Sequence, residues 1–290
     1  MTVDGREPRS VLVAGCGYVG SALAMMLVAD GDRVWGLRRD PAGLPDGVRP
    51  VRGDVTQPRR LDGVPPHLDA VVYAVAPAGR TEEAYRAAYV DGLVNVLRAA
   101  GDDHTPFRGR LVLVSSTGVY GESEGAWVDE DTPPEPVDAT GRVLVEAERI
   151  ARTFGGRGVT LRLGGIYGPG RDRTVRRVLS GEAGCPEPDR FGNRIHRDDA
   201  AAAARHLISL QDPHPVYVGV DRDPADLRTV YRWIAERAGI ADPCADNRDD
   251  GTLPTRRRGT NKRCSSERLV RSGYTFRYPT FREGYAEFIR

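Results

Sequence analysis

The sequence predicts an α/β protein in which a doubly wound parallel sheet carries a smaller C-terminal lobe. Short apolar runs alternate with helical patterns over residues 1–168, and a glycine-rich turn follows the first run. After Gly168 the pattern becomes irregular and rich in Gly, Pro and Arg. Strands and helices that alternate at this spacing form βαβ units with right-handed crossovers and a parallel sheet covered on both faces. In such sheets, ligands bind at the carboxyl ends of the strands.

Six apolar runs in the first part of the chain are short and uninterrupted, as buried parallel strands are. Segments with apolar residues at helical spacing separate several of them. We therefore assign residues 1–168 to the main domain. The strands are expected at residues 10–14, 33–37, 48–52, 70–76, 110–114 and 159–163, and the helices at 21–29, 81–100 and 141–154.

The remaining residues, 169–290, are expected to form a smaller lobe that is partly interleaved with the main domain. The interleaving follows from residues 216–220, which read as a strand that returns to the sheet. The run of three arginines at 256–258 is expected to be a solvated loop. Helices are expected at 198–210, at 226–238 and near Tyr285, and a loop at 242–263.

Composition narrows the class of protein. The 290 residues have a formal net charge of +1, and acidic and basic residues alternate, so we expect neither a nucleic-acid nor a membrane partner. The polar start of the chain and the lack of an apolar run of roughly 20 residues favour a cytoplasmic protein. The four cysteines are scattered without ligand spacing, so we expect no metal site and no disulfide.

The glycine-rich turn, Gly15-Cys16-Gly17-Tyr18-Val19-Gly20, lies between a predicted strand and a predicted helix. The first glycine permits a tight turn, the second lets the backbone approach a phosphate, and the third lets the helix pack on the strand. The helix N-terminus then faces the anion. The turn therefore predicts a Rossmann-type dinucleotide-binding domain whose pyrophosphate is held by Gly15, Gly17, Tyr18, Val19 and Gly20.

The end of the second strand selects the cofactor. Where an acidic residue would bind the ribose hydroxyls of NAD, this chain has Arg38 and Arg39, followed by Asp40. Because arginine binds phosphate in a bidentate manner, the pair favours the 2′-phosphate of NADP; the alternative is an exposed pair, with Asp40 serving NAD. Asp54 is expected either beside the adenine or in a simple turn, and Ala76 beside the cofactor at the end of the fourth strand.

Several segments together resemble the extended short-chain dehydrogenase/reductase family, in the group that holds NAD(P)-dependent sugar-nucleotide epimerases and dehydratases. The resemblance spans nearly the whole chain. It implies a Rossmann fold, a nicotinamide cofactor, a small-molecule substrate and a homodimer formed by the helices at 81–100 and 141–154. Besides the glycine turn, the segments are residues 53–55, 115–121, 161–170, 194–199, 261–263, 277–279 and 282–284.

The chain departs from this family at the active site. The family uses a Tyr-x-x-x-Lys pair, but Thr140 and Leu144 stand at the two positions, and Lys262 is the only lysine in the chain. The spacing of the glycine turn also differs from the usual Gly-x-x-Gly-x-x-Gly. The resemblance is therefore to an atypical subgroup. Reduction of a ketone builds an alkoxide that must receive a proton, so another group has to supply it.

Four side chains are candidates for the chemistry. Ser116, at the end of the fifth strand, corresponds to the family's substrate-polarising residue, or else caps the strand. Tyr89 is a proton donor or a core aromatic, and Tyr167 is expected at the edge of the pocket. His196 titrates near neutral pH, yet it begins a helix and is alternatively structural. We lean towards a tyrosine as the donor.

These observations lead to three hypotheses for the function. The first is an NADP-binding oxidoreductase that acts on an unknown small molecule. The second is a non-catalytic protein that senses NAD(P) and presents its small lobe to a partner. The third is a sugar-nucleotide epimerase or dehydratase, which is weakened because those reactions depend on the tyrosine and lysine that are replaced here.

Overall fold

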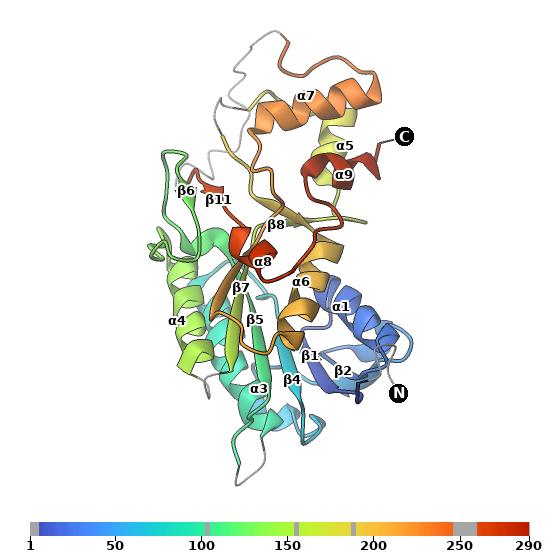
Figure 1. Cartoon of the computed structure of the whole chain (residues 1–290), viewed down its shortest axis with the longest axis vertical. Coiled ribbons are helices and arrows are strands. Elements are labelled where there is room, and N and C mark those ends of the chain that lie inside the picture. The colour runs from blue at the N-terminus through green and yellow to red at the C-terminus, as the bar shows by residue number, and fades with distance from the viewer. Residues whose placement is uncertain (1–5, 102–104, 154–156, 187–189, 246–259, 290) are drawn as a thin grey trace. The chain divides into compact units, whose positions relative to one another are not determined.

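The computed structural model describes residues 6–101, 105–153, 157–186, 190–245 and 260–289. The largest sheet has seven strands, in the order β10-β7-β5-β4-β1-β2-β3 (Figure 1). Strand β1 pairs in parallel with both β2 and β4, so the order reverses beside β1. The predicted fold class is confirmed. The strands are β1 (Ser10–Ala14), β2 (Arg33–Arg38), β3 (Arg49–Arg52), β4 (Ala70–Tyr73), β5 (Arg110–Ser116), β7 (Gly158–Leu163) and β10 (Val216–Gly219).

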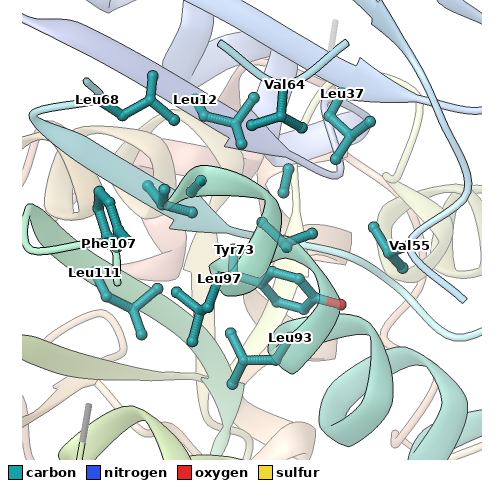
Figure 2. Packing of buried hydrophobic residues seen from close by; sticks show 14 of the residues in the cluster. Leu12, Leu37, Val55, Val64, Leu68, Tyr73, Leu93, Leu97, Phe107 and Leu111 are labelled. Carbon is teal, nitrogen blue, oxygen red and sulfur yellow. The ribbon is translucent and has the colours of Figure 1, made fainter. Parts of the chain in front are cut away.

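Helices cover both faces of the sheet, with α3 and α4 on one face and α1 and α6 on the other (Figure 1). The apolar side chains of the strands meet those of the helices in a continuous core, where Leu12, Tyr73, Leu93 and Leu111 are fully buried (Figure 2). Burial on both faces explains why these strands are almost entirely apolar. The helices are α1 (Tyr18–Ala29), α2 (Glu82–Tyr85), α3 (Gly92–Ala100), α4 (Ala139–Thr153) and α6 (Arg197–Ser209).

The single helix predicted at 81–100 is interrupted by a π-helical segment, η3 (Arg86–Asp91). A π-helical turn leaves carbonyl groups without their usual partners. Here the buried hydroxyl of Tyr73 donates a hydrogen bond to the carbonyl oxygen of Ala88. The predicted strand at 70–76 is also shorter than expected and ends at Tyr73. The Tyr73–Ala88 hydrogen bond joins two separate elements, so no local pattern in the sequence encodes it.

The chain divides into two compact units. The sheet unit comprises Met1–Val119, Asp138–Arg162 and Ala200–Tyr217, and the second unit comprises Tyr120–Val137, Leu163–Asp199 and Val218–Arg290. The second unit has its own core around Tyr167, Val175, Ile234 and Phe281. Its elements are β6 (Trp127–Val128), β8 (Gly165–Tyr167), α5 (Arg173–Leu179), β9 (Arg194–His196), α7 (Leu227–Ala238), β11 (Arg263–Cys264), α8 (Glu267–Arg271) and α9 (Phe281–Ala286).

The prediction that the chain has no disulfide is wrong, because Cys185 and Cys244 are joined in the second unit. The two residues are 59 positions apart, so their spacing gives no local signal. Cys16 and Cys264 are buried and take no part in the disulfide. The arginine run at 256–258 lies outside the described residues. None of the described helices combines the length and the apolar character that a membrane span requires.

Candidate functional site

The glycine turn connects β1 to α1, and two of its glycines have no room for a side chain. Gly15 has a φ of +84°, and a Cβ atom on it would lie 2.6 Å from the backbone of Ala74. A Cβ atom on Gly20 would lie 2.5 Å from the carbonyl oxygen of Gly15. The turn can therefore bend sharply, and α1 can approach β1 closely, only because both positions are glycine.

The middle glycine, Gly17, faces open space. A Cβ atom on it would meet nothing nearer than the Gly15 carbonyl oxygen at 3.9 Å. Gly17 caps α1 without a side-chain hydrogen bond, and the first turn of α1, which begins with Tyr18 and Val19, contains no acidic residue. A helix N-terminus of this kind attracts anions. The residues of the turn thus fit the pyrophosphate of a dinucleotide.

A pocket of about 540 Å³ lies in the sheet unit and carries three guanidinium groups. Arg39 follows β2, Arg52 ends β3, and Arg60 ends the short 3₁₀ helix η2 (Pro58–Arg60). The parallel register pairs Arg38 with Arg52, so the two strand ends lie side by side. Arg39 was predicted from the sequence as a cofactor-binding residue, whereas Arg52 and Arg60 were not. The pocket is lined by Arg39, Arg52, Gly53, Asp54, Arg60, Asp62 and Gly63.

Acidic residues lie close to these arginines: Asp40 Oδ1 is 3.9 Å from Arg52 Nη2, and Asp54 lines the pocket itself. Asp54 Oδ1 accepts hydrogen bonds from the backbone N–H of Thr56 at 3.0 Å and from the Thr56 hydroxyl at 2.8 Å. Burial opposes ionisation, but these hydrogen bonds and the guanidinium groups of Arg39 and Arg60 together lower the pKa of Asp54. Asp54 therefore forms a turn and also presents a carboxylate to the pocket.

The two arginines predicted to bind the cofactor point to different places. Arg38 Nη1 donates to the carbonyl oxygen of Cys16 at 3.4 Å, so Arg38 lies against the glycine turn, whereas Arg39 lines the pocket. Asp40 accepts a hydrogen bond from the N–H of Ala42 and so caps the 3₁₀ helix η1 (Pro41–Gly43). Ala76 lies exposed in the loop after β4.

Ser116 is the last residue of β5. Its Oγ accepts a hydrogen bond from the N–H of Gly118 at 3.0 Å, which leaves the hydroxyl proton available to a ligand. At the start of α4, the Thr140 hydroxyl donates to Asp138 Oδ1 at 2.8 Å. Leu144 is 5% exposed and belongs to the packed side of that helix. Both readings of Ser116, strand cap and substrate contact, are compatible with this geometry.

Tyr89 lies on the π-helical segment, partly buried against the core of the sheet unit. Its ring is 5.5 Å from that of Tyr85. Burial raises the pKa of Tyr89 to about 12, and Tyr85 adds to the effect. A proton donor would need the opposite shift. The packing is therefore that of a core aromatic, and a catalytic role for Tyr89 stays a prediction.

Tyr167 and His196 meet in the second unit, where the parallel register of β8 and β9 pairs them. Their rings are 5.4 Å apart in an edge-to-face arrangement. Burial raises the pKa of Tyr167, whose hydroxyl has no hydrogen-bond partner among the described residues. Burial lowers the pKa of His196, and its Nδ1 accepts the N–H of Asp198 in the first turn of α6. His196 is thus a neutral helix cap here.

Two buried charge clusters were missed by the sequence analysis. In the sheet unit, Glu148 accepts hydrogen bonds from Arg162 and from Ser115, which precedes Ser116. In the second unit, the side chains of Arg194 and Asp221 are buried, and each has an atom without a hydrogen-bond partner among the described residues. Burial raises the pKa of Asp221 to about 8.

Comparison with known proteins shows which family model matches the chain and which proteins it resembles. The model of the family "NAD dependent epimerase/dehydratase family" matches residues 11–183. A solved structure of a putative NAD-dependent epimerase/dehydratase from Methylobacillus flagellatus is 37% identical, with 97% of each chain covered and a TM-score of 0.78. Protein YeeZ of Escherichia coli is 27% identical over 93% of this chain and 97% of its own. The 3-diazoavenalumate denitrifying reductase of a Streptomyces species is 29% identical over 80% of this chain and 83% of its own.

Proposed function

This chain belongs to the NAD dependent epimerase/dehydratase family, and we propose that it is an NADP-binding oxidoreductase that acts on a small molecule. The observation that carries the proposal is the pocket lined by Arg39 after β2, Arg52 at the end of β3 and Arg60 at the end of η2. In dinucleotide-binding sheets the adenosine ribose lies at the end of the second strand. Because arginine binds phosphate in a bidentate manner, the three arginines that line the pocket suit a 2′-phosphate.

Each part of the sheet unit then has a role in holding the cofactor. Gly15, Gly17 and Gly20, with Tyr18 and Val19, form the turn that accepts the pyrophosphate. Arg38 reinforces the turn through the Cys16 carbonyl oxygen. Arg39 and Arg60 bind the 2′-phosphate, and Asp54 presents its carboxylate to the adenine side of the pocket. The nicotinamide, when bound, supplies or accepts a hydride.

The side chains at the strand ends are the ones expected to act on the substrate. Ser116 keeps a hydroxyl proton with which to polarise a carbonyl group. Thr140 and Leu144 cannot act as the family's acid pair, because a leucine gives no charge to lower the pKa of a neighbouring hydroxyl. Tyr89, Tyr167 and His196 remain the candidate proton donors, and the reaction is one that tolerates a weak acid or takes its proton from water.

The relatives carry the names of both reductases and epimerases, and the reductases support a reductive activity. One of them is named a denitrifying reductase, and it resembles this chain over four fifths of its length. The raised pKa values of Tyr89 and Tyr167 argue against a strong general acid. They also keep open the alternative that the protein binds the cofactor without turnover and acts as a sensor.

Paired arginine variants test the cofactor preference. Replacing Arg39 and Arg60 by alanine should weaken NADP binding by about 1.5–3 kcal/mol for each charge-assisted contact and leave NAD binding nearly unchanged. Arg59→Ala is the matched control, because Arg59 is the exposed neighbour of Arg60 and does not line the pocket. An equal loss in Arg59→Ala, or an equal loss for both cofactors, would reject the assignment.

Turnover separates the enzyme from the sensor. Loss of absorbance at 340 nm with a panel of carbonyl, imine and diazo substrates supports an oxidoreductase. Once a substrate is found, Ser116→Ala should lower kcat more than KM. Tight binding of the cofactor with no turnover on the panel would favour the sensor instead.

A further inference from the structure

Helix α7 anchors two segments of the second unit on one of its faces. Arg228 Nε donates to the carbonyl oxygen of Pro186 at 2.6 Å. Arg232 Nε, one turn further along, donates to Asp242 Oδ2 at 3.1 Å. Residues four apart in a helix project on the same side, so the two arginines hold the two segments next to each other.

Each anchor lies directly beside a cysteine. Cys185 precedes Pro186 in the chain. The backbone N–H of Cys244 donates to the other carboxylate oxygen of Asp242, at 2.9 Å. The disulfide joins the two cysteines at a Cα–Cα distance of 4.8 Å. The anchors involve no sulfur atom, so breaking the sulfur–sulfur bond removes no atom that takes part in them.

We propose that Cys185 and Cys244 form a reversible thiol–disulfide pair, a redox modification site that α7 preorganises. The oxidant is a low-molecular-weight disulfide such as glutathione disulfide. One cysteine thiolate attacks it and releases one reduced glutathione, and the second cysteine displaces the other glutathione from the mixed disulfide. The protein loses two electrons and two thiol protons, and both protons leave on the two glutathione thiols.

Preorganisation makes the bond easy to form again after reduction, because the two thiols have a high effective concentration. The side chains are 6% and 8% exposed, so exchange requires the segments to open locally, which slows the reaction but leaves its equilibrium unchanged. The disulfide then adds a covalent tie between the connection that follows α5 and the connection that follows α7.

Cys16 and Cys264 serve as internal references. Both are buried and outside the disulfide, and burial raises the pKa of Cys16. Thiolates, not thiols, take part in exchange, so Cys16 should stay reduced in the same buffers. The full-length protein therefore contains one pair that responds to the buffer and two cysteines that do not.

The experiment equilibrates the full chain with glutathione buffers of stepped oxidation ratio, quenches with an alkylating agent under denaturing conditions and counts thiols by intact mass. The expected result is a single step between four and two alkylated cysteines, assigned to Cys185 and Cys244 by peptide mapping. A pair that stays oxidised, or one that stays reduced, in every buffer would overturn the proposal.

Anchor variants test the preorganisation itself. Arg228→Ala combined with Arg232→Ala should lower the equilibrium constant for disulfide formation by about tenfold or more, because the effective concentration of the thiols falls. Arg237→Ala is the control, an exposed arginine on the same helix. An unchanged equilibrium constant in the double variant, with circular dichroism showing a folded protein, would overturn the role of α7.

Discussion

Arg162 and Glu148 form an ion pair that is almost completely enclosed by the sheet unit. Arg162 Nη2 lies 2.7 Å from Glu148 Oε2, and the two side chains are 4% and 7% exposed. The Ser115 hydroxyl donates to the other carboxylate oxygen at 2.7 Å. The pair fixes α4 to β5 and β7, and so fixes the helix that carries Thr140 relative to the strand that carries Ser116.

Breaking this pair should strongly destabilise the protein. Glu148→Ala leaves a buried guanidinium group without its partner, so we expect a loss of about 3–5 kcal/mol in the free energy of unfolding. Urea denaturation measures it. The double variant Glu148→Leu/Arg162→Met removes both charges and should cost less than Glu148→Ala alone. A loss below about 1 kcal/mol in Glu148→Ala would show that the pair is not structural.

The glycine turn allows folding and binding to be separated. Gly17→Ala should keep the melting temperature, because its Cβ atom meets nothing nearer than 3.9 Å, but should weaken dinucleotide binding by crowding the phosphate. Gly20→Ala should lower both, since its Cβ atom would lie 2.5 Å from a backbone oxygen. Differential scanning fluorimetry with and without cofactor measures both effects. Unchanged dinucleotide binding in Gly17→Ala would contradict the assignment of the pyrophosphate to this turn.

Leu144 is expected to contribute packing and not chemistry. Because it is 5% exposed, Leu144→Ala should cost about 2–5 kcal/mol in unfolding free energy and leave a folded protein that still binds its cofactor. Thr140→Ala, on the same helix, should keep turnover. If Thr140→Ala abolished turnover while cofactor binding persisted, Thr140 would be a catalytic residue after all.

Asp221 should make stability depend on pH. Burial raises its pKa in the folded protein to about 8, against the pull of Arg194 and with the support of Asp223 and Asp199. A carboxyl group whose pKa is raised on folding stabilises the folded state at pH values below its pKa in the unfolded chain, which is near 4. That stabilisation is lost as the pH rises towards 8. Tyr167 also faces this group.

Asp221→Asn should remove this loss. Between pH 5 and 8, the unmodified protein should lose at least about 1 kcal/mol more of its unfolding free energy than the variant loses. Asp212→Asn, at an exposed position, is the control. Parallel pH profiles for Asp221→Asn and the unmodified protein would mean that Asp221 is ionised in the fold.

The parts of the fold and site that the sequence revealed are those encoded by neighbouring residues. The apolar strand runs, the glycine turn and the Arg38–Arg39 pair each lie within one short segment. Arg52 and Arg60 became visible only through the register of β2 and β3 and the position of η2. No residue pattern near either of them marks a pocket.

Other features depend on long-range contacts and could not be predicted from local pattern. Glu148 and Arg162 lie on a helix and a strand, where a charged residue normally faces water. Cys185 and Cys244 are joined across 59 positions of the chain, and α7 contacts the segments of both. His196 has the residue type of a catalytic group, yet its Nδ1 caps α6. The type of a residue alone does not tell whether it forms a buried ion pair, a disulfide or a helix cap.

The most direct test of the central claim is isothermal titration of the unmodified protein with NADP and with NAD under identical conditions. The pocket formed by Arg39, Arg52 and Arg60 predicts that NADP binds at least about tenfold more tightly, which corresponds to one charge-assisted contact with the 2′-phosphate. The difference should shrink as the salt concentration rises. Equal affinities for the two cofactors, or tighter binding of NAD, would contradict the account.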